Sequence, residues 1–145
     1  MNQYTQQKFV GERALFQSRD LELSYCTFAD GESPLKESKN LKIENCLFQW
    51  KYPLWYCQNV EVKHSTMFEM ARAGIWYTDH ISMEDITYQA PKGFRRCKDV
   101  VLKDINFPNA AETLWNCSQV KMQNVTAKGD YFAMGSSDME IDNFT

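Results

Sequence analysis

The stretch Leu21-Glu-Leu23-Ser-Tyr-Cys26-Thr-Phe28 recurs along the chain at a nearly constant interval. It returns as Leu41-Lys-Ile43-Glu-Asn-Cys46-Leu-Phe48 and again as Val60-Glu-Val62-Lys-His-Ser65-Thr-Met67. With the later copies that begin at Ile81, Val100, Val120 and Met139, seven copies start 19 to 21 residues apart. Self-similarity at a short fixed period is the signature of a solenoid, in which each repeat packs only on its neighbours.

The pattern inside each copy predicts two short strands joined by a bend. Leu21 and Leu23 alternate with polar residues, and the alternation resumes after a two-residue gap at Cys26 and Phe28. Alternation with a period of two is typical of strands, and the gap breaks it. The position just before each copy holds Asp20, Asn40, Asn59, His80, Asp99, Gln119 and Asp138. Asp and Asn tolerate the left-handed conformation, so this column predicts a corner.

A second apolar column lies six residues before each copy and consists of Leu15, Leu35, Leu54, Ile75, Phe94 and Leu114. All variation in repeat length falls between the Phe28-type and the Leu35-type positions. This spacing predicts a coil with three faces, two tight corners and one corner of variable length. Leucine-rich and helical repeats fit less well because the repeat leaves too little room for helices. We therefore predict an all-β protein, a right-handed parallel β-helix of about seven rungs, forming one domain over residues 1–145.

Composition excludes several classes of function. The net charge of −3, with both signs interspersed, gives no indication of a nucleic-acid partner. The polar N-terminus and the absence of a long apolar run predict neither a signal peptide nor a membrane span, so the cytoplasm is the expected location. Five cysteines spaced near 20 residues apart match no metal motif, and we expect them to be buried free thiols, with no metal and no cofactor bound.

Several phrases resemble a known family, among them Gly11-Glu-Arg-Ala-Leu-Phe16, Lys51-Tyr-Pro-Leu-Trp-Tyr56, Arg72-Ala-Gly-Ile-Trp-Tyr77 and Pro91-Lys-Gly-Phe-Arg-Arg96. They are similar to an uncharacterised bacterial family of pectin-lyase-like right-handed β-helix proteins that has a domain-of-unknown-function label. The resemblance extends over nearly the whole chain and implies a fold rather than an activity. Members of that family are longer than this chain, so the resemblance implies that the chain is an N-terminal half of such a protein or a short relative.

One wall of the predicted coil is rich in aromatic and cationic residues. Each residue that follows the second apolar column points outward if its neighbour points inward. We call this set, with the position after it, the outward wall, and it contains Lys36, Trp55, Tyr56, Trp76, Tyr77, Arg95, Arg96 and Trp115. In-register stacking predicts a cation–π sandwich of Arg95 between two indoles. With Arg72 upstream, these residues are the predicted ligand-binding site.

The wall supports three hypotheses of function, which the sequence leaves open. The first is a protein that binds or processes carbohydrate, with Glu32 and Glu112 as the weak catalytic candidates. The second is a non-catalytic scaffold that binds another protein through the same wall. The third is a purely structural solenoid domain. Whether the chain is an enzyme is not decided by its sequence.

The end of the chain and the two histidines complete the predictions. Met139, Ile141 and Phe144 continue the inward apolar pattern up to the last residues. An uncovered rung exposes apolar side chains and a strand edge, so we expect a second subunit or a missing C-terminal half to cover this end. His64 and His80 fall at the bend and at the corner, where a structural role is expected.

Overall fold

The structure is a computed structural model that describes residues 2–145. Strands alternate with bends, turns and irregular segments over this range, and no helix occurs within it. Accordingly, none of the described residues form a helix long and apolar enough to cross a membrane. The all-β prediction is confirmed.

Thirteen strands follow one another along the chain. Most belong to one large sheet, and β7 and β9 form a small second sheet. The strands are β1 (Asn2–Thr5), β2 (Lys8–Phe9), β3 (Arg19–Ser24), β4 (Thr27–Phe28), β5 (Lys39–Glu44), β6 (Leu47–Phe48), β7 (Leu54–Trp55), β8 (Gln58–Met67), β9 (Ile75–Trp76), β10 (Asp79–Tyr88), β11 (Lys98–Phe107), β12 (Ser118–Ala127) and β13 (Ser137–Phe144).

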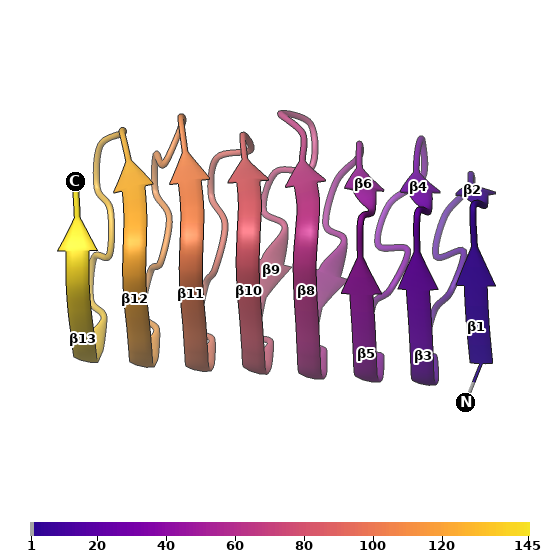
Figure 1. The fold of residues 1–145 in the computed structure, drawn as a ribbon, viewed down its shortest axis with the longest axis horizontal. Coiled ribbons are helices and arrows are strands. Elements are labelled where there is room, and N and C mark those ends of the chain that lie inside the picture. The colour runs from indigo at the N-terminus through magenta and orange to yellow at the C-terminus, as the bar shows by residue number, and fades with distance from the viewer. Residues whose placement is uncertain (1) are drawn as a thin grey trace.

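The main sheet is a stack of rungs in the order β1-β3-β5-β8-β10-β11-β12-β13, with every neighbouring pair parallel. Its register aligns like residues, so that Leu21 pairs with Leu41, and Leu41 with Val60. Figure 1 shows the chain rising along each front strand, returning behind the sheet and advancing by one strand per turn, which is a right-handed coil. The predicted parallel β-helix is confirmed.

The main sheet has eight successive rungs, one more than the predicted number of about seven. The first rung is β1, whose Asn2 and Tyr4 pair with Leu21 and Leu23. Asn2 is polar and exposed at a position where later rungs bury an apolar residue. The apolar pattern is therefore degraded in this rung, which hides it from a search for repeats.

Left-handed backbone residues recur at four turning positions from Arg13 onward, more corners than the predicted three-faced coil requires, and Phe94, Leu114 and Ala133 add a fifth in the later rungs. Arg13, Gln17, Asp20 and Tyr25 all have φ between 53° and 58°, and their spacing of four, three and five residues recurs in later rungs. The Asp20 column was predicted to be a corner and is confirmed by its positive φ angles. Only the step from the Tyr25-type to the next left-handed position varies, between seven and nine residues. The predicted variable turn lies there.

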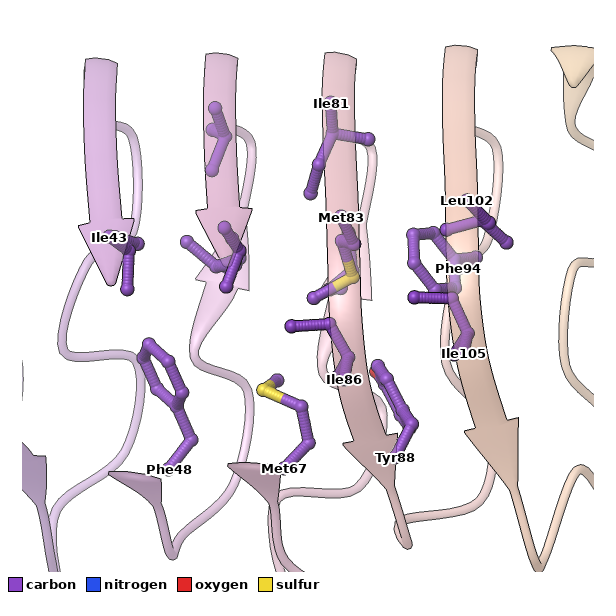
Figure 2. Packing of buried hydrophobic residues seen from close by; sticks show 14 of the residues in the cluster. Ile43, Phe48, Met67, Ile81, Met83, Ile86, Tyr88, Phe94, Leu102 and Ile105 are labelled. Carbon is purple, nitrogen blue, oxygen red and sulfur yellow. The ribbon is translucent and has the colours of Figure 1, made fainter. Parts of the chain in front are cut away.

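The core is a continuous column of buried side chains contributed by successive rungs (Figure 2). Phe28 and Phe48 stack with ring centroids 5.0 Å apart and planes at 5°. Met67 and Tyr88 continue the same position in the next rungs and are fully buried. Because one rung lies about 4.8 Å above the last, like side chains meet face to face.

A column of small polar residues satisfies backbone groups at the corner. The Cys57 N–H donates to the Thr78 hydroxyl (3.2 Å), and this hydroxyl donates to the Leu54 carbonyl (2.7 Å). A thiol takes the same place one rung earlier, where Cys57 Sγ donates to the Leu35 carbonyl (3.1 Å). Serine, threonine and cysteine are the small residues that can both donate and accept here. All five cysteines are free and buried, which confirms that prediction.

The C-terminal rung leaves its inward residues uncovered. Ile141 of β13 is 53% exposed and Phe144 is 40% exposed, whereas Val125, the register partner of Phe144, is 1% exposed. The inward pattern is thus present but lies open at this end. That a further array of rungs or a second subunit covers it stays a prediction.

Candidate functional site

The outward wall is positioned by the small sheet and by the bridges that extend it. Leu54 of β7 and Ile75 of β9 point into the core, so the next residues, Trp55 and Trp76, point outward and pair in register. Isolated parallel bridges join Trp76 to Arg95 and Arg95 to Trp115. The four side chains therefore follow one another along the solenoid axis.

Stacking along the wall agrees with the predicted geometry. The rings of Trp55 and Trp76 lie 5.0 Å apart with planes at 5°. The Arg95 guanidinium carbon lies 4.2 Å from the ring centroid of Trp76 and 5.1 Å from that of Trp115. The cation–π sandwich is confirmed, whereas ligand binding by these residues stays a prediction.

The position beside the wall forms a second ladder. Tyr56 and Tyr77 stack at 4.8 Å with planes at 12°, and Lys36 Nζ lies 5.9 Å from the Tyr56 ring. Arg96 continues this ladder and is exposed. All eight residues predicted for the wall are exposed or half-buried.

The indole nitrogens of the wall bind backbone rather than solvent. Trp76 Nε1 donates to the Lys92 carbonyl (2.8 Å) and Trp115 Nε1 donates to the Tyr131 carbonyl (2.6 Å). Trp55 Nε1 donates in the same way to the Ala73 carbonyl. Each bond joins an indole to the next rung, so the wall also fastens adjacent rungs together.

A shallow hollow of about 390 Å³ lies beside the indoles. Tyr52 stands on one side of it, with its ring 4.5 Å from that of Trp55, and the predicted ligand residue Arg72 lines it as well. Ala73 and Lys92 complete the lining with Trp76. Tyr52, Ala73 and Lys92 were not among the predicted site residues. They occupy one left-handed column, and comparing this column across rungs would have revealed a small residue, Ala73, between two long side chains.

The two catalytic candidates do not form a pair. Glu32 and Glu112 lie four rungs apart in the backbone register, about 19 Å at a rise of about 4.8 Å per rung. Two carboxyl groups that act on one glycosidic bond lie about 5–10 Å apart. Glu112 instead pairs with Lys92, whose Nζ lies 3.7 Å from its carboxylate. A catalytic role for either residue has no geometric support.

The histidines hold structural positions, as predicted. His64 Nδ1 lies 2.7 Å from an Asp85 oxygen in the next rung, and His80 Nδ1 lies 2.7 Å from an Asp99 oxygen. Both histidines have positive φ angles, so they serve as turning residues. Within residues 2–145, no three His, Cys, Asp or Glu side chains are arranged to hold a metal ion.

This combination of parallel in-register rungs, left-handed corners and a continuous inner column defines a parallel β-solenoid protein. The chain belongs to DUF3737, a family described as a protein of unknown function, which it matches over residues 2–145. No curated protein matches it. The predicted relation to a family of unknown function is thereby confirmed, but nothing supports a pectin-lyase-like relationship.

Solved structures resemble the chain in fold. QnrB1, a plasmid-mediated fluoroquinolone resistance protein, has a TM-score of 0.51 at 10% identity, over 99% of this chain and 83% of that chain. A candidate glycosyl hydrolase from Parabacteroides merdae has a TM-score of 0.39 at 10% identity, over 95% and 78%. HetL, a pentapeptide repeat protein from Nostoc, has a TM-score of 0.30 at 8% identity, over 98% and 87%. At these identities the likeness to QnrB1 concerns the fold alone, and the other two support no argument.

Proposed function

We propose that this chain is a non-catalytic scaffold that binds a partner protein through the outward wall. The observation behind the proposal is the way in which the aromatic rings are packed. Trp55, Trp76, Arg95 and Trp115 cover one another's faces, so the wall offers ring edges and cationic groups to an approaching molecule. Trp, Tyr and Arg are the residues most enriched at the energetic centres of protein interfaces.

The same packing weakens the carbohydrate hypothesis. A sugar ring that stacks on an aromatic side chain needs a free ring face, and both faces of Trp76 are occupied, one by Trp55 and the other by Arg95. The distance between Glu32 and Glu112 removes the carboxylate pair that glycoside hydrolysis requires. Carbohydrate binding is therefore the competing outcome of the test rather than the proposal.

A peptide-display selection tests the proposal. A library of random dodecapeptides is panned against the chain, and the enriched peptides are counter-screened against Trp76→Ala. We expect peptides whose affinity falls by about 1–3 kcal/mol in the variant, the range of an interface hot spot. A circular dichroism spectrum that matches that of the parent chain shows that the variant is folded.

A glycan array provides the opposing measurement. Glycan binding that is lost in Trp76→Ala, combined with no enriched peptide, would replace the proposal by the carbohydrate hypothesis. If neither peptide binding nor glycan binding is lost in Trp76→Ala, the purely structural role is left. A cytoplasmic location, which would place the wall among cytoplasmic proteins, stays a prediction that cell fractionation can check.

A further inference from the structure

The hollow beside the wall exists because one left-handed column has a small residue between two large ones. Ala73 occupies the position that Tyr52 holds in the rung before and Lys92 holds in the rung after. Its methyl group leaves a dent between the two longer side chains, and the indoles of Trp55 and Trp76 lie alongside. A volume of about 390 Å³ lies in the range of ligand pockets and accommodates an anchoring side chain.

The side-chain nitrogens around the hollow that do not bind backbone carbonyls are cationic. The indole nitrogens of Trp55 and Trp76 already donate to backbone carbonyls. The backbone nitrogens of Tyr52, Ala73 and Lys92 donate to carbonyls of the next rung. The side-chain nitrogens that can donate to a bound group are therefore those of Arg72 and Lys92, and both side chains are exposed at the rim.

The surroundings of the hollow are positively charged although the chain as a whole is acidic. The three adjacent segments 51–56, 72–77 and 91–96 contain no Asp or Glu, against a net charge of −3 for the chain. Glu112 is the one carboxylate that pairs with a rim cation among the described residues, through Lys92 at 3.7 Å. The cations of the three segments are Lys51, Arg72, Lys92, Arg95 and Arg96.

We propose that the hollow at Ala73 receives an acidic peptide segment of a partner protein, with one aromatic or aliphatic side chain seated between Tyr52 and Lys92. Carboxylates next to that anchor meet Arg72 and the cations of the wall. This inference rests on the proposed function, because it specifies where the partner binds and what chemistry it presents. Charge complementarity selects an acidic segment over a neutral or basic one.

Substitution at Ala73 is the sharpest test because the column itself shows which side chains the backbone accepts. Lys92 and Tyr52 have the same left-handed conformation as Ala73, with φ of 59° for both against 48°. Ala73→Lys and Ala73→Tyr should therefore fold and fill the dent, and Ala73→Lys does so while adding a positive charge, so that a loss of binding there cannot come from weaker attraction of an acidic peptide. Arg72→Glu reverses the charge at the rim, and Lys121→Glu, on the exposed face of β12, is the matched control.

The peptides selected in the display experiment are sequenced, synthesised with a fluorescent label and titrated by anisotropy. We expect enrichment of Asp and Glu around one apolar residue, and affinity about tenfold weaker with either Ala73 variant and with Arg72→Glu. The Lys121→Glu control should bind as the parent chain does. Affinity should also fall as NaCl is raised, since the attraction is screened.

The outcomes separate the two proposals. Wall-dependent peptides that are neutral or basic, or that still bind Ala73→Lys and Ala73→Tyr, overturn the acidic-segment inference and leave the scaffold function standing. The absence of any peptide that depends on Trp76 overturns both. If the chain bound an oligothymidylate of matched charge as tightly as it binds the selected peptide, the hollow would be a general anion-binding surface. This result would also overturn the inference.

Discussion

The inner column and the outward wall stack aromatic rings with the same geometry but in different surroundings. Phe28 and Phe48 lie inside the coil with centroids 5.0 Å apart and planes at 5°, and Trp55 and Trp76 lie outside it with the same two values. The phenyl rings are almost fully buried, whereas the indoles are half-buried. The rung repeat therefore sets the stacking, with or without burial. Stacked rings alone do not indicate function, and the evidence for a site lies in the cations and the hollow.

The largest expected difference between the two regions is the cost of removing a ring. Phe48→Ala deletes a fully buried ring from the inner column and should lower the free energy of unfolding by about 3–5 kcal/mol. Leu47→Ala, next to it in β6 but 36% exposed, should change it by no more than about 0.5 kcal/mol. Urea titrations followed by fluorescence measure both. Equal losses would contradict the assignment of inward and outward positions.

Alkaline pH should destabilise the fold by ionising groups that are buried inside the coil. Burial raises the pKa of Cys46 and of Cys57 from 9.0 to about 11, because the thiolate is poorly solvated there. A group with a raised pKa in the folded state stabilises it below the unfolded pKa, and this contribution is lost as pH rises from 9 toward 11. Burial also raises the pKa of the Tyr88 hydroxyl, which acts in the same direction. The free energy of unfolding should therefore be lower at pH 10.5 than at pH 8.

Serine in place of Cys46 and Cys57 provides the control for the alkaline effect. Serine already occupies the column of Cys57 at Ser38 and the column of Cys46 at Ser65, and its hydroxyl keeps the hydrogen bonds without titrating in this range. The double variant should lose less stability between pH 8 and pH 10.5 than the parent chain. An identical loss in both proteins would assign the effect to other groups.

Substitutions in the outward wall should lower the free energy of unfolding by less than substitutions in the inner column. Trp76→Ala removes a stacked ring, a cation–π contact and a hydrogen bond to Lys92, and should cost about 1–2 kcal/mol. Arg95→Lys keeps the charge but loses the planar group between two indoles, so it should cost about 0.5–1 kcal/mol. Arg96→Lys, at an exposed position, is the matched control and should be neutral. A neutral Arg95→Lys would show that the sandwich adds no stability.

Sequence periodicity predicted the parts of the molecule that repeat. Leu21, Leu41 and Val60 reveal the register because an inward position tolerates little besides apolar residues. The stacking of Trp76 on Arg95 followed from that register. The first rung was missed because Asn2 breaks the pattern. The hollow was missed because it arises where Ala73 stands between two long side chains rather than from a repeated residue. Repeats predict the scaffold, and departures from the repeat form the candidate site.

The smallest expected effect concerns one atom inside the column. Tyr88 occupies the position that Phe28, Phe48 and Phe107 hold in other rungs, and it is fully buried. Its hydroxyl is the one buried side-chain polar atom among the described residues without a hydrogen-bond partner. A buried polar group without a partner costs about 1–3 kcal/mol of desolvation. Removing the oxygen also leaves a small void, because Gly74 and Gly93 provide room for it. These two contributions oppose each other, so Tyr88→Phe should leave the free energy of unfolding at pH 8 unchanged or raise it by up to about 1 kcal/mol.

Urea titration checks this value, with Phe107→Leu as the control for a change of shape at the same position of the next rung. A loss of more than about 1 kcal/mol in Tyr88→Phe would mean that the hydroxyl has a partner, such as a buried water molecule, and that the inner column is not uniformly apolar.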